Sequence, residues 1–193
     1  PTTWTILIDN GNTHTNSLTV ELTLSATVSW APMWEMRFSC NNSTWTAWED
    51  YATTRDWTFG TQYWCNTNTW TKTVYVQYRD SIWNGTVTAS DSIIYDNTQP
   101  TCTITKNPNS WTSWSVELTL NPSNANEYSR TWYTNMSSTN SPKVVTANWT
   151  YTWYVKNAAG NTWYCTTTLT WIDQSGPTTW TILIDNGNTH TNS

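Results

Sequence analysis

Threonine alternates with Val, Ile, Leu and Tyr over many short stretches of the chain, as in residues 18–26 and 72–80. Alternation of this kind is typical of half-buried strands, because successive side chains of a strand point to opposite faces. Helix-forming residues nowhere accumulate at the helical period. The pattern predicts an all-β chain with strands at 4–9, 18–26, 34–39, 45–51, 53–58, 72–80, 87–95, 102–105, 115–120, 126–133, 143–147, 151–157 and 163–171.

The first seventeen residues, PTTWTILIDNGNTHTNS, occur again at 177–193. Identity over so long a stretch is not chance, so the chain contains parts of two copies of a long repeat, of which one begins at Pro1 and the next at Pro177. The second occurrence is predicted to be the first strand of a further module.

A second division lies inside the repeat. Residues 96–101, DNTQPT, and residues 173–178, DQSGPT, both follow an apolar strand and place a proline before the next strand. The hairpin patterns at 76–84 and 153–161 are separated along the sequence by the same constant offset as these two junctions. Because proline stiffens such a junction, we predict module 1 at 1–98, module 2 at 99–175 and the incomplete start of a next copy at 176–193.

Six or seven short strands per module, separated by turns, describe an immunoglobulin-like or fibronectin-like β-sandwich. The stretches MRFS at 36–39, STWTAWEDY at 43–51, KTVYVQYRD at 72–80 and NAAGN at 157–161 resemble bacterial Ig-like tandem repeats of large surface proteins and adhesins. The resemblance implies a cell-surface stalk or adhesin array. It implies neighbouring repeats as partners and brings no catalytic residues.

Composition narrows the possible partners. The net charge is −5 and only 11% of residues are charged, so nothing attracts nucleic-acid phosphates or an anionic membrane. No apolar run approaches the roughly 20 residues of a membrane span, so we expect no membrane insertion in this segment. The expected partners are therefore neighbouring repeats, with surface glycans or another cell surface as the alternative.

The four cysteines favour an oxidising, extracellular compartment. Cys40 and Cys65 fall in module 1, whereas Cys102 and Cys165 fall on the first and last strands of module 2. Since first and last strands often lie close together in sandwiches, we predict the disulfides Cys40–Cys65 and Cys102–Cys165. No cysteine pair has the short spacing of a zinc site.

Tryptophan is unusually frequent and glycine unusually rare, with 17 and 6 residues. Trp83 in DSIWN occupies the turn position that Gly160 holds in NAAGN. Some bacteria read the UGA codon as glycine and others read it as tryptophan, so we hypothesise an alternative genetic code in which many of these residues are natural glycines. The best glycine candidates are Trp4, Trp30, Trp70, Trp83, Trp111, Trp114, Trp149, Trp163, Trp171 and Trp180, while Trp34, Trp64, Trp132 and Trp153 are ambiguous.

The alternative takes every tryptophan at face value. Exposed indoles on a β-sandwich stack on sugar rings, so the module could bind a carbohydrate or a partner surface. Trp45, Trp48 and Trp57, which the family resemblance keeps as tryptophan, are the possible ligand-binding residues.

Other chemistry is sparse. His14 and His190 are one repeat position seen twice, in a polar loop, and Glu49 and Asp50 are adjacent and so point to opposite faces of a strand. We therefore predict no enzyme, no catalytic residues and no bound cofactor. Asp80, Asp96 and Asp173 are weak calcium candidates near the junctions, but calcium takes six to eight oxygen ligands.

Overall fold

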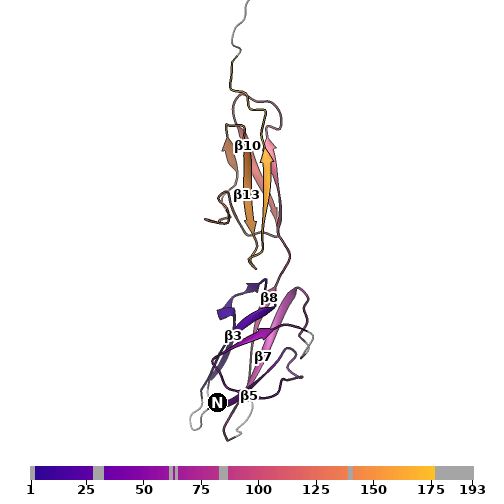
Figure 1. Ribbon diagram of the computed structural model, residues 1–193, viewed down its shortest axis with the longest axis vertical. Helices are drawn as coiled ribbons and strands as arrows, with labels where there is room; N and C mark the ends of the chain where they lie inside the picture. Colours follow the sequence, from indigo (N-terminus) through magenta and orange to yellow (C-terminus); the bar gives the residue numbers. More distant parts are fainter. Residues whose placement is uncertain are drawn as a thin grey trace, which may run out of the picture.

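The computed structural model describes residues 3–27, 33–60, 63, 65–82, 87–138 and 141–176. Two bodies of β-strands lie end to end along the long axis of the molecule, joined by the segment between β8 and β9 (Figure 1). We call them the N-terminal sandwich (β1–β8) and the C-terminal sandwich (β9–β14). Within the described residues, no helix is long and apolar enough to cross a membrane.

The N-terminal sandwich has two sheets, ordered β1-β3-β6 and β2-β8-β7-β4-β5. All its strand pairs are antiparallel except β2 and β8, which are parallel. A short 3-10 turn, η1 (Asp9–Gly11), follows β1. The strands are β1 (Thr3–Ile8), β2 (His14–Thr15), β3 (Thr19–Thr27), β4 (Met33–Ser39), β5 (Glu49–Asp50), β6 (Thr54–Thr58), β7 (Trp70–Asp80) and β8 (Val87–Tyr95).

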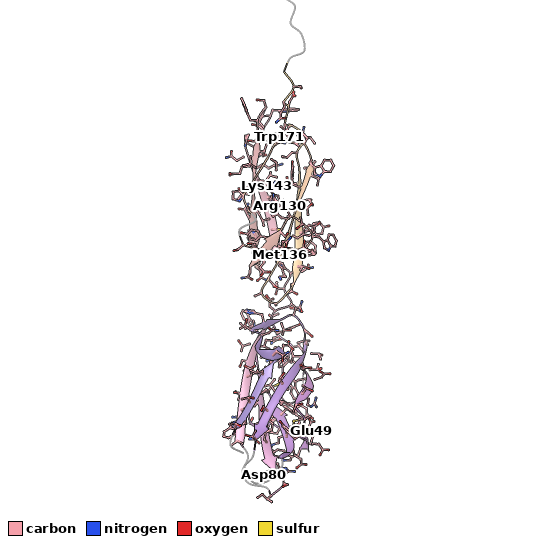
Figure 2. The ribbon with its side chains drawn as sticks, turned by 90° about the vertical axis from the view of Figure 1, so that its left-hand side faces the viewer. Glu49, Asp80, Arg130, Met136, Lys143 and Trp171 are labelled. Atoms are coloured by element: carbon pink, nitrogen blue, oxygen red, sulfur yellow. A yellow bond between two sulfur atoms is a disulfide. The ribbon has the colours of Figure 1, made fainter. Side chains whose placement is uncertain are left out.

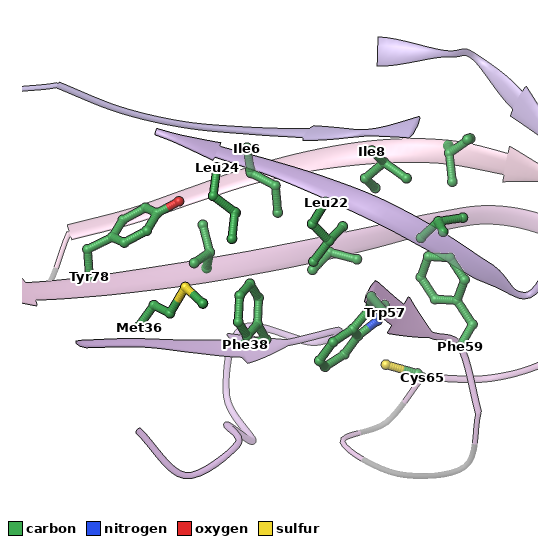
Figure 3. Packing of buried hydrophobic residues seen from close by; sticks show 14 residues of the cluster. Ile6, Ile8, Leu22, Leu24, Met36, Phe38, Trp57, Phe59, Cys65 and Tyr78 are labelled. Atoms are coloured by element: carbon green, nitrogen blue, oxygen red, sulfur yellow. The ribbon is translucent and has the colours of Figure 1, made fainter. Parts of the chain in front are cut away.

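Alternation of the strands places their apolar side chains between the two sheets. Ile8 and Leu22 from one sheet meet Phe38 and Tyr78 from the other, and all four are fully buried (Figure 3). Trp57 joins this cluster with its ring centroid 5.5 Å from that of Phe38. The buried Tyr78 hydroxyl donates a hydrogen bond to the Thr5 carbonyl, 3.0 Å away, which satisfies its polar group inside the core.

The C-terminal sandwich has smaller sheets, ordered β12-β10-β9 and β11-β13-β14. Its core consists mainly of Val116, Leu118, Trp153, Val155 and Leu169. The strands are β9 (Thr101–Asn107), β10 (Val116–Ser123), β11 (Glu127–Ser129), β12 (Lys143–Val145), β13 (Thr150–Lys156) and β14 (Thr162–Thr168).

Both expected disulfides are confirmed. Cys40–Cys65 joins the end of β4 to the segment before β7, with Cα atoms 5.2 Å apart. Cys102–Cys165 joins β9 to β14 across 5.9 Å and so ties the two sheets of the C-terminal sandwich together. This second bridge closes a long loop, with a sequence separation of 63, which in the chain-entropy model stabilises the fold by about 4 kcal/mol.

The strand predictions hold for most elements and fail at three places. The strand expected at 45–51 is reduced to β5, because the preceding segment is held instead by the Thr46 hydroxyl and amide on the backbone of Phe38. The strand expected at 126–133 is only β11, since the chain turns back at Thr131 and Thr134. The two-residue β2 was not expected, because it is too short to show alternation.

Candidate functional site

The segment between the two sandwiches is anchored on Asp96, the residue that follows β8. Its backbone amide donates to the Thr15 carbonyl at 3.0 Å, which extends the pairing of β8 with β2. Its Oδ1 accepts the amide of Thr98 at 2.8 Å, an Asx turn that fixes the direction of the next residues. Pro100, which begins the approach to β9, is buried. The residues that follow β8 are therefore held by the N-terminal sandwich and by their own turn, independently of their contacts with the second sandwich.

Two asparagines of the C-terminal sandwich hold the same carboxylate. Asn124, after β10, and Asn157, after β13, donate from Nδ2 to Asp96 Oδ2 at 3.4 and 3.1 Å. Both amides also reach the Thr98 carbonyl, at 3.3 and 3.1 Å. The turn that follows β13 contributes again, because Asn161 Nδ2 donates to the Asp96 carbonyl at 2.7 Å. We call Asp96, Thr98, Asn124, Asn157 and Asn161 the junction clamp.

Asn157 is the most buried member of the clamp, with 3% of its surface exposed. Its backbone amide donates to the Asn161 carbonyl at 3.0 Å, and its Oδ1 accepts the Asn161 amide at 2.9 Å. The turn between them needs Gly160, whose φ of +90° is a conformation that residues with a Cβ atom rarely adopt. The tight turn from Asn157 to Asn161 thus supports the clamp, because its polar groups are hydrogen-bonded both within the turn and to Asp96 and Thr98 across the junction.

A direct contact between the two sandwiches lies beside the clamp. Asn16, just after β2, donates from Nδ2 to Asn161 Oδ1 at 3.4 Å. A cleft of about 310 Å³ opens next to it, lined by His14, Thr69, Trp70, Ile94, Tyr95, Asp96, Thr98 and Asn124. Both sandwiches therefore contribute residues to this cleft.

The environment of Asp96 favours its charged form. Partial burial raises its pKa, but the hydrogen bonds from Thr98 and Asn124 and the electrostatic interaction with His14 act in the opposite direction and together prevail, so the pKa is lowered. Protonation would put a hydrogen on an oxygen that already faces amide donors. The clamp is therefore built for a carboxylate.

The same turn recurs at the other end of the C-terminal sandwich. Asp173 Oδ1 accepts the amide of Ser175 at 2.9 Å, as Asp96 Oδ1 accepts the amide of Thr98 at the matching place in the sequence. Hydrogen bonds from the Ser175 hydroxyl and amide lower the pKa of Asp173. The Asp173 amide donates to the Thr112 carbonyl at 2.9 Å, so the segment leaving this sandwich is also held at its base.

Two of the three tryptophans expected to bind a ligand lie on the outside of the N-terminal sandwich. Arg37 places its guanidinium 5.1 Å from the ring centre of Trp45 and 4.5 Å from that of Trp48, and Arg79 lies 4.3 Å from Trp48. Arg79 in turn pairs with Glu35. The indoles are half-buried members of a cation–π ladder, which stabilises the sheet face on which they lie.

Trp57, the third of these tryptophans, lies mostly inside the N-terminal sandwich. It is 5% exposed, and its ring belongs to the core beside Phe38. The pattern of β6 explains this, because Trp57 lies on the face of that strand that turns toward the opposite sheet. Trp57 and Trp48 also line a cleft of about 400 Å³, together with the Glu49–Arg55 ion pair, whose nitrogen and oxygen are 2.5 Å apart.

A cluster of aromatic rings, in which Trp132, Trp163 and Tyr164 are exposed, lies on the C-terminal sandwich. Tyr154 of β13 is its centre, with ring centroids 4.9 Å from Tyr133, 5.4 Å from Trp132 and 6.2 Å from Tyr164. Trp163 stacks on Tyr164 at 5.8 Å. Sequence reasoning missed this aromatic cluster, although Tyr154 and Tyr164 come from strands that we predicted, because the register that pairs them and the turn that adds Trp132 are set by tertiary structure.

The tryptophans differ widely in environment. Trp153 is fully buried in the core, while Trp4 and Trp171 pack partly against the two cores. Trp70 and Trp132 have positive φ values of 140° and 38°. Five are between 69% and 79% exposed, namely Trp70, Trp111, Trp114, Trp132 and Trp149. Trp30, Trp64, Trp83, Trp180 and the side chain of Trp34 lie outside the described residues, as does the segment 177–193.

The calcium candidates do not form one site. Asp80 ends β7 at the end of the N-terminal sandwich remote from the junction, whereas Trp171, close in sequence to Asp173, marks the opposite end of the molecule (Figure 2). Asp80 was expected near the junction with Asp96, but β7 is 11 residues long, so the strand carries it about 33 Å away. Among the described residues, no three Asp, Glu, His or Cys side chains converge where a metal ion could bind.

Comparison with known proteins identifies the fold. No protein-family model and no curated protein matches the chain. Among solved structures, the fibronectin(III)-like modules of CbhA from Clostridium thermocellum match with a TM-score of 0.52 and 10% identity, over 84% of this chain and 92% of that one. A tetra-tandem repeat in the extending region of a large adhesion protein matches with a TM-score of 0.29 and 14% identity, over 89% of this chain and 49% of that one. The chain is thus an all-β protein with the fibronectin III-like β-sandwich fold.

The junction clamp predicts that Asp96→Ala destabilises the C-terminal sandwich. The substitution leaves the buried Asn157 amide without an acceptor on the carboxylate, at a cost of about 1–3 kcal/mol. Asp173→Ala is the matched control, because it removes the same kind of turn where no asparagine clamp is present among the described residues, and it should change stability by no more than about 0.5 kcal/mol. Urea unfolding of both variants measures the difference, and equal losses would contradict a special role for Asp96.

Proposed function

We propose that the chain is a non-enzymatic spacer segment of a large extracellular bacterial protein of the adhesin type, exposed on the cell surface. Modules 1–98 and 99–175 act as successive units of a semi-rigid stalk, with neighbouring repeats of the same chain as their partners. The observation that carries this proposal is the junction clamp. A flexible tether needs no such contacts, whereas a spacer that must hold its direction does.

The clamp supports a stiff joint through the number and placement of its bonds. Asp96 receives donors from its own linker and from two separate turns of the next sandwich. A rotation between the sandwiches would break several of these bonds together and would expose Asn157, which is now buried. The recurrence of the turn at Asp173 supports a similar start to the next joint.

The chemistry of the chain supports an extracellular location. Both disulfides persist only where thiols are kept oxidised, and among the described residues there are no free cysteines. The surface is rich in Thr, Ser and Asn and poor in charge, which suits repeated units that must stay apart from nucleic acids and anionic membranes.

A second candidate function is glycan binding on the aromatic cluster. Trp132, Tyr164 and Trp163 are large apolar side chains exposed to solvent at one place, and such patches mark binding surfaces. Sugar rings combine apolar faces with hydroxyl groups. The tilted rings of the cluster present apolar faces and tyrosine hydroxyls, so they are complementary to a neutral sugar. This candidate adds a ligand to the stalk and does not replace the spacer role.

We also propose that several tryptophans are glycines in the native protein, translated through an alternative genetic code. The positive φ values of Trp70 and Trp132 support this, because a bulky residue is strained there and glycine is not. The high exposure of Trp111, Trp114 and Trp149 adds support, since a large apolar side chain that stays in water contributes little burial free energy to the fold. Glycine at 132 and 163 would leave Tyr133, Tyr154 and Tyr164 as the remaining aromatic cluster.

A stiff joint predicts a narrow distribution of distances between spin labels placed at Ser90 and Thr166, one exposed site in each sandwich. In Asn157→Ala/Asn161→Ala the distribution should broaden, because the clamp loses its donors. Asn121→Ala, an exposed asparagine of β10 away from the clamp, is the control and should leave the distribution unchanged. Electron–electron double resonance makes the measurement. A broad distribution in the unaltered chain would reject the semi-rigid spacer.

Glycan binding predicts that cellohexaose or chitohexaose changes the intrinsic fluorescence of the chain in a saturable manner. Tyr154→Ala removes the ring at the centre of the aromatic cluster and should weaken binding by about tenfold, which corresponds to about 1.4 kcal/mol. Trp149→Ala, exposed outside the cluster, should bind as the unaltered chain does. Equal loss in both variants, or no saturable change, would reject this candidate.

The decoding proposal predicts glycine at 70, 111, 114 and 149 in the protein purified from its native cell. Peptide mass spectrometry reads these positions directly, and Trp153, buried in the core, provides a comparison within the same protein. Tryptophan at all four positions would contradict the proposal.

A further inference from the structure

The chain enters the N-terminal sandwich at one end and leaves it at the other. The Thr5 carbonyl accepts a hydrogen bond from the hydroxyl of Tyr78, which pairs with Val87 at the start of β8. The Ile8 amide donates to the carboxylate of Asp91, further along β8. β1 therefore runs in the same direction as β8, and β2 also pairs with β8 in parallel. A pull on the two ends of this sandwich thus acts along its strands.

This direction of pull makes the N-terminal sandwich resistant but extensible. β1 is paired with β3 along its whole length, from Thr3 to Ile8, and must slide past it, so the hydrogen bonds of the pair break together rather than one after another. Once they are broken, the sandwich can unravel. Its disulfide keeps only the stretch between Cys40 and Cys65 from extending, with a sequence separation of 25.

The C-terminal sandwich has a covalent shortcut between its first and last strands. Cys102 is in β9 and Cys165 is in β14, and their bridge has a sequence separation of 63. A load that enters at Thr101 passes through the two sulfur atoms into Thr166 and leaves the loop between the cysteines without tension. The load is therefore carried by covalent bonds, whereas in the N-terminal sandwich it is carried by hydrogen bonds between strands.

Most of the C-terminal core lies inside this unloaded loop. Val116, Leu118, Trp153 and Val155 are fully buried and come from β10 and β13, between the two cysteines. The end of β14 and the residues up to Ile172 are on the loaded path. A pull can detach this last segment, but it does not act on the strands that form the centre of the core.

We propose that the chain is a tension-bearing link in which the Cys102–Cys165 bridge carries load past the C-terminal core and the N-terminal sandwich is the extensible half. The inference rests on the proposed spacer role, because only a chain held at both ends is pulled along its axis. Under load the two halves of the repeat behave differently. The N-terminal sandwich lengthens when its strands slide, while the C-terminal sandwich keeps its fold.

The aromatic cluster belongs to the half that keeps its fold. All five of its rings are inside the unloaded loop, so tension does not separate them; they are Trp132, Tyr133, Tyr154, Trp163 and Tyr164. A ligand bound to this cluster would therefore stay bound to an unaltered surface while the neighbouring sandwich extends.

The shortcut depends on the oxidation state of the bridge. A dithiol reductant attacks one sulfur atom and displaces the other as a thiolate, and the second thiol of the reductant then closes its own disulfide and frees both cysteines. Cleavage of Cys102–Cys165 adds its loop to the loaded path, which lengthens the chain by about 220 Å. Cleavage of Cys40–Cys65 adds only about 90 Å, so the length of a step identifies the bridge.

Single-molecule force spectroscopy with a tag at each end of the chain tests the load path. In the oxidised chain the N-terminal sandwich should unfold, and no step of about 220 Å should follow. After dithiothreitol is added under constant load, that step should appear. Its rate should rise several-fold with load, because tension favours the lengthened sulfur–sulfur bond of the transition state. A step of that length without reductant, or a rate that is independent of load, would overturn the proposal.

Two variants with matched changes assign the steps. Cys102→Ser/Cys165→Ser should gain about 220 Å of extension without reductant, whereas Cys40→Ser/Cys65→Ser should gain about 90 Å and still keep its C-terminal sandwich folded. A first variant that does not fold lengthens smoothly from low load, and the reduction step of the unaltered chain then decides. A broad spin-label distribution would reject the semi-rigid spacer alone, because the load path through the sulfur atoms does not depend on the stiffness of the joint.

Discussion

The carboxylate of Asp96 is the interaction on which the arrangement of the two sandwiches depends. It closes its own turn on Thr98 and accepts amide hydrogens from Asn124 and Asn157. The backbone amide of Asp96 donates to Thr15, so this one residue is bonded to both bodies. An ionised carboxylate with amide donors forms bonds stronger than neutral pairs, and partial burial lowers the local dielectric screening. Because the donors come from two different turns, they restrict the orientation of one sandwich relative to the other as well as strengthen the joint.

A joint can fix the orientation of the two sandwiches only if each sandwich is itself stably folded. The two sandwiches are stabilised in different ways. The N-terminal sandwich has an extended core that includes Phe38, Trp57 and Tyr78, with an outer layer of arginines stacked on Trp45 and Trp48. The C-terminal sandwich has a smaller core around Trp153. A small core buries little apolar surface to offset the conformational entropy that the chain loses on folding. The Cys102–Cys165 bridge between its sheets compensates, because it lowers the conformational entropy of the unfolded chain.

Local sequence patterns predicted the features that depend on local chemistry. Alternation placed β3, β7 and β8 nearly to the residue. The Cys102–Cys165 pairing followed from positions on the first and last predicted strands of module 2, and the Cys40–Cys65 pairing from the presence of both cysteines in module 1. The constant offset between the two halves of the repeat identified the turns that hold Asp96 and Asp173. The asparagines that complete the clamp were not predictable, since they are far from Asp96 in sequence and meet it only through the packing of two bodies. Asp80 was misplaced for the same reason, because sequence distance from Asp96 does not show that a long strand separates them.

In the spacer proposed above, the repeat implies two kinds of joint. The junction clamp joins an N-terminal sandwich to a C-terminal one through the amide of Asn157. When 76–84 is aligned with 153–161, the residue that matches Asn157 in the N-terminal sandwich is Asp80, which is 5% exposed. A carboxylate has no amide hydrogen to donate, so the joint that follows Asp173 cannot repeat the same bond to its own carboxylate. We therefore expect stiffness to alternate along the array with the period of the repeat, because one joint is clamped by amides and the next must be held by other contacts.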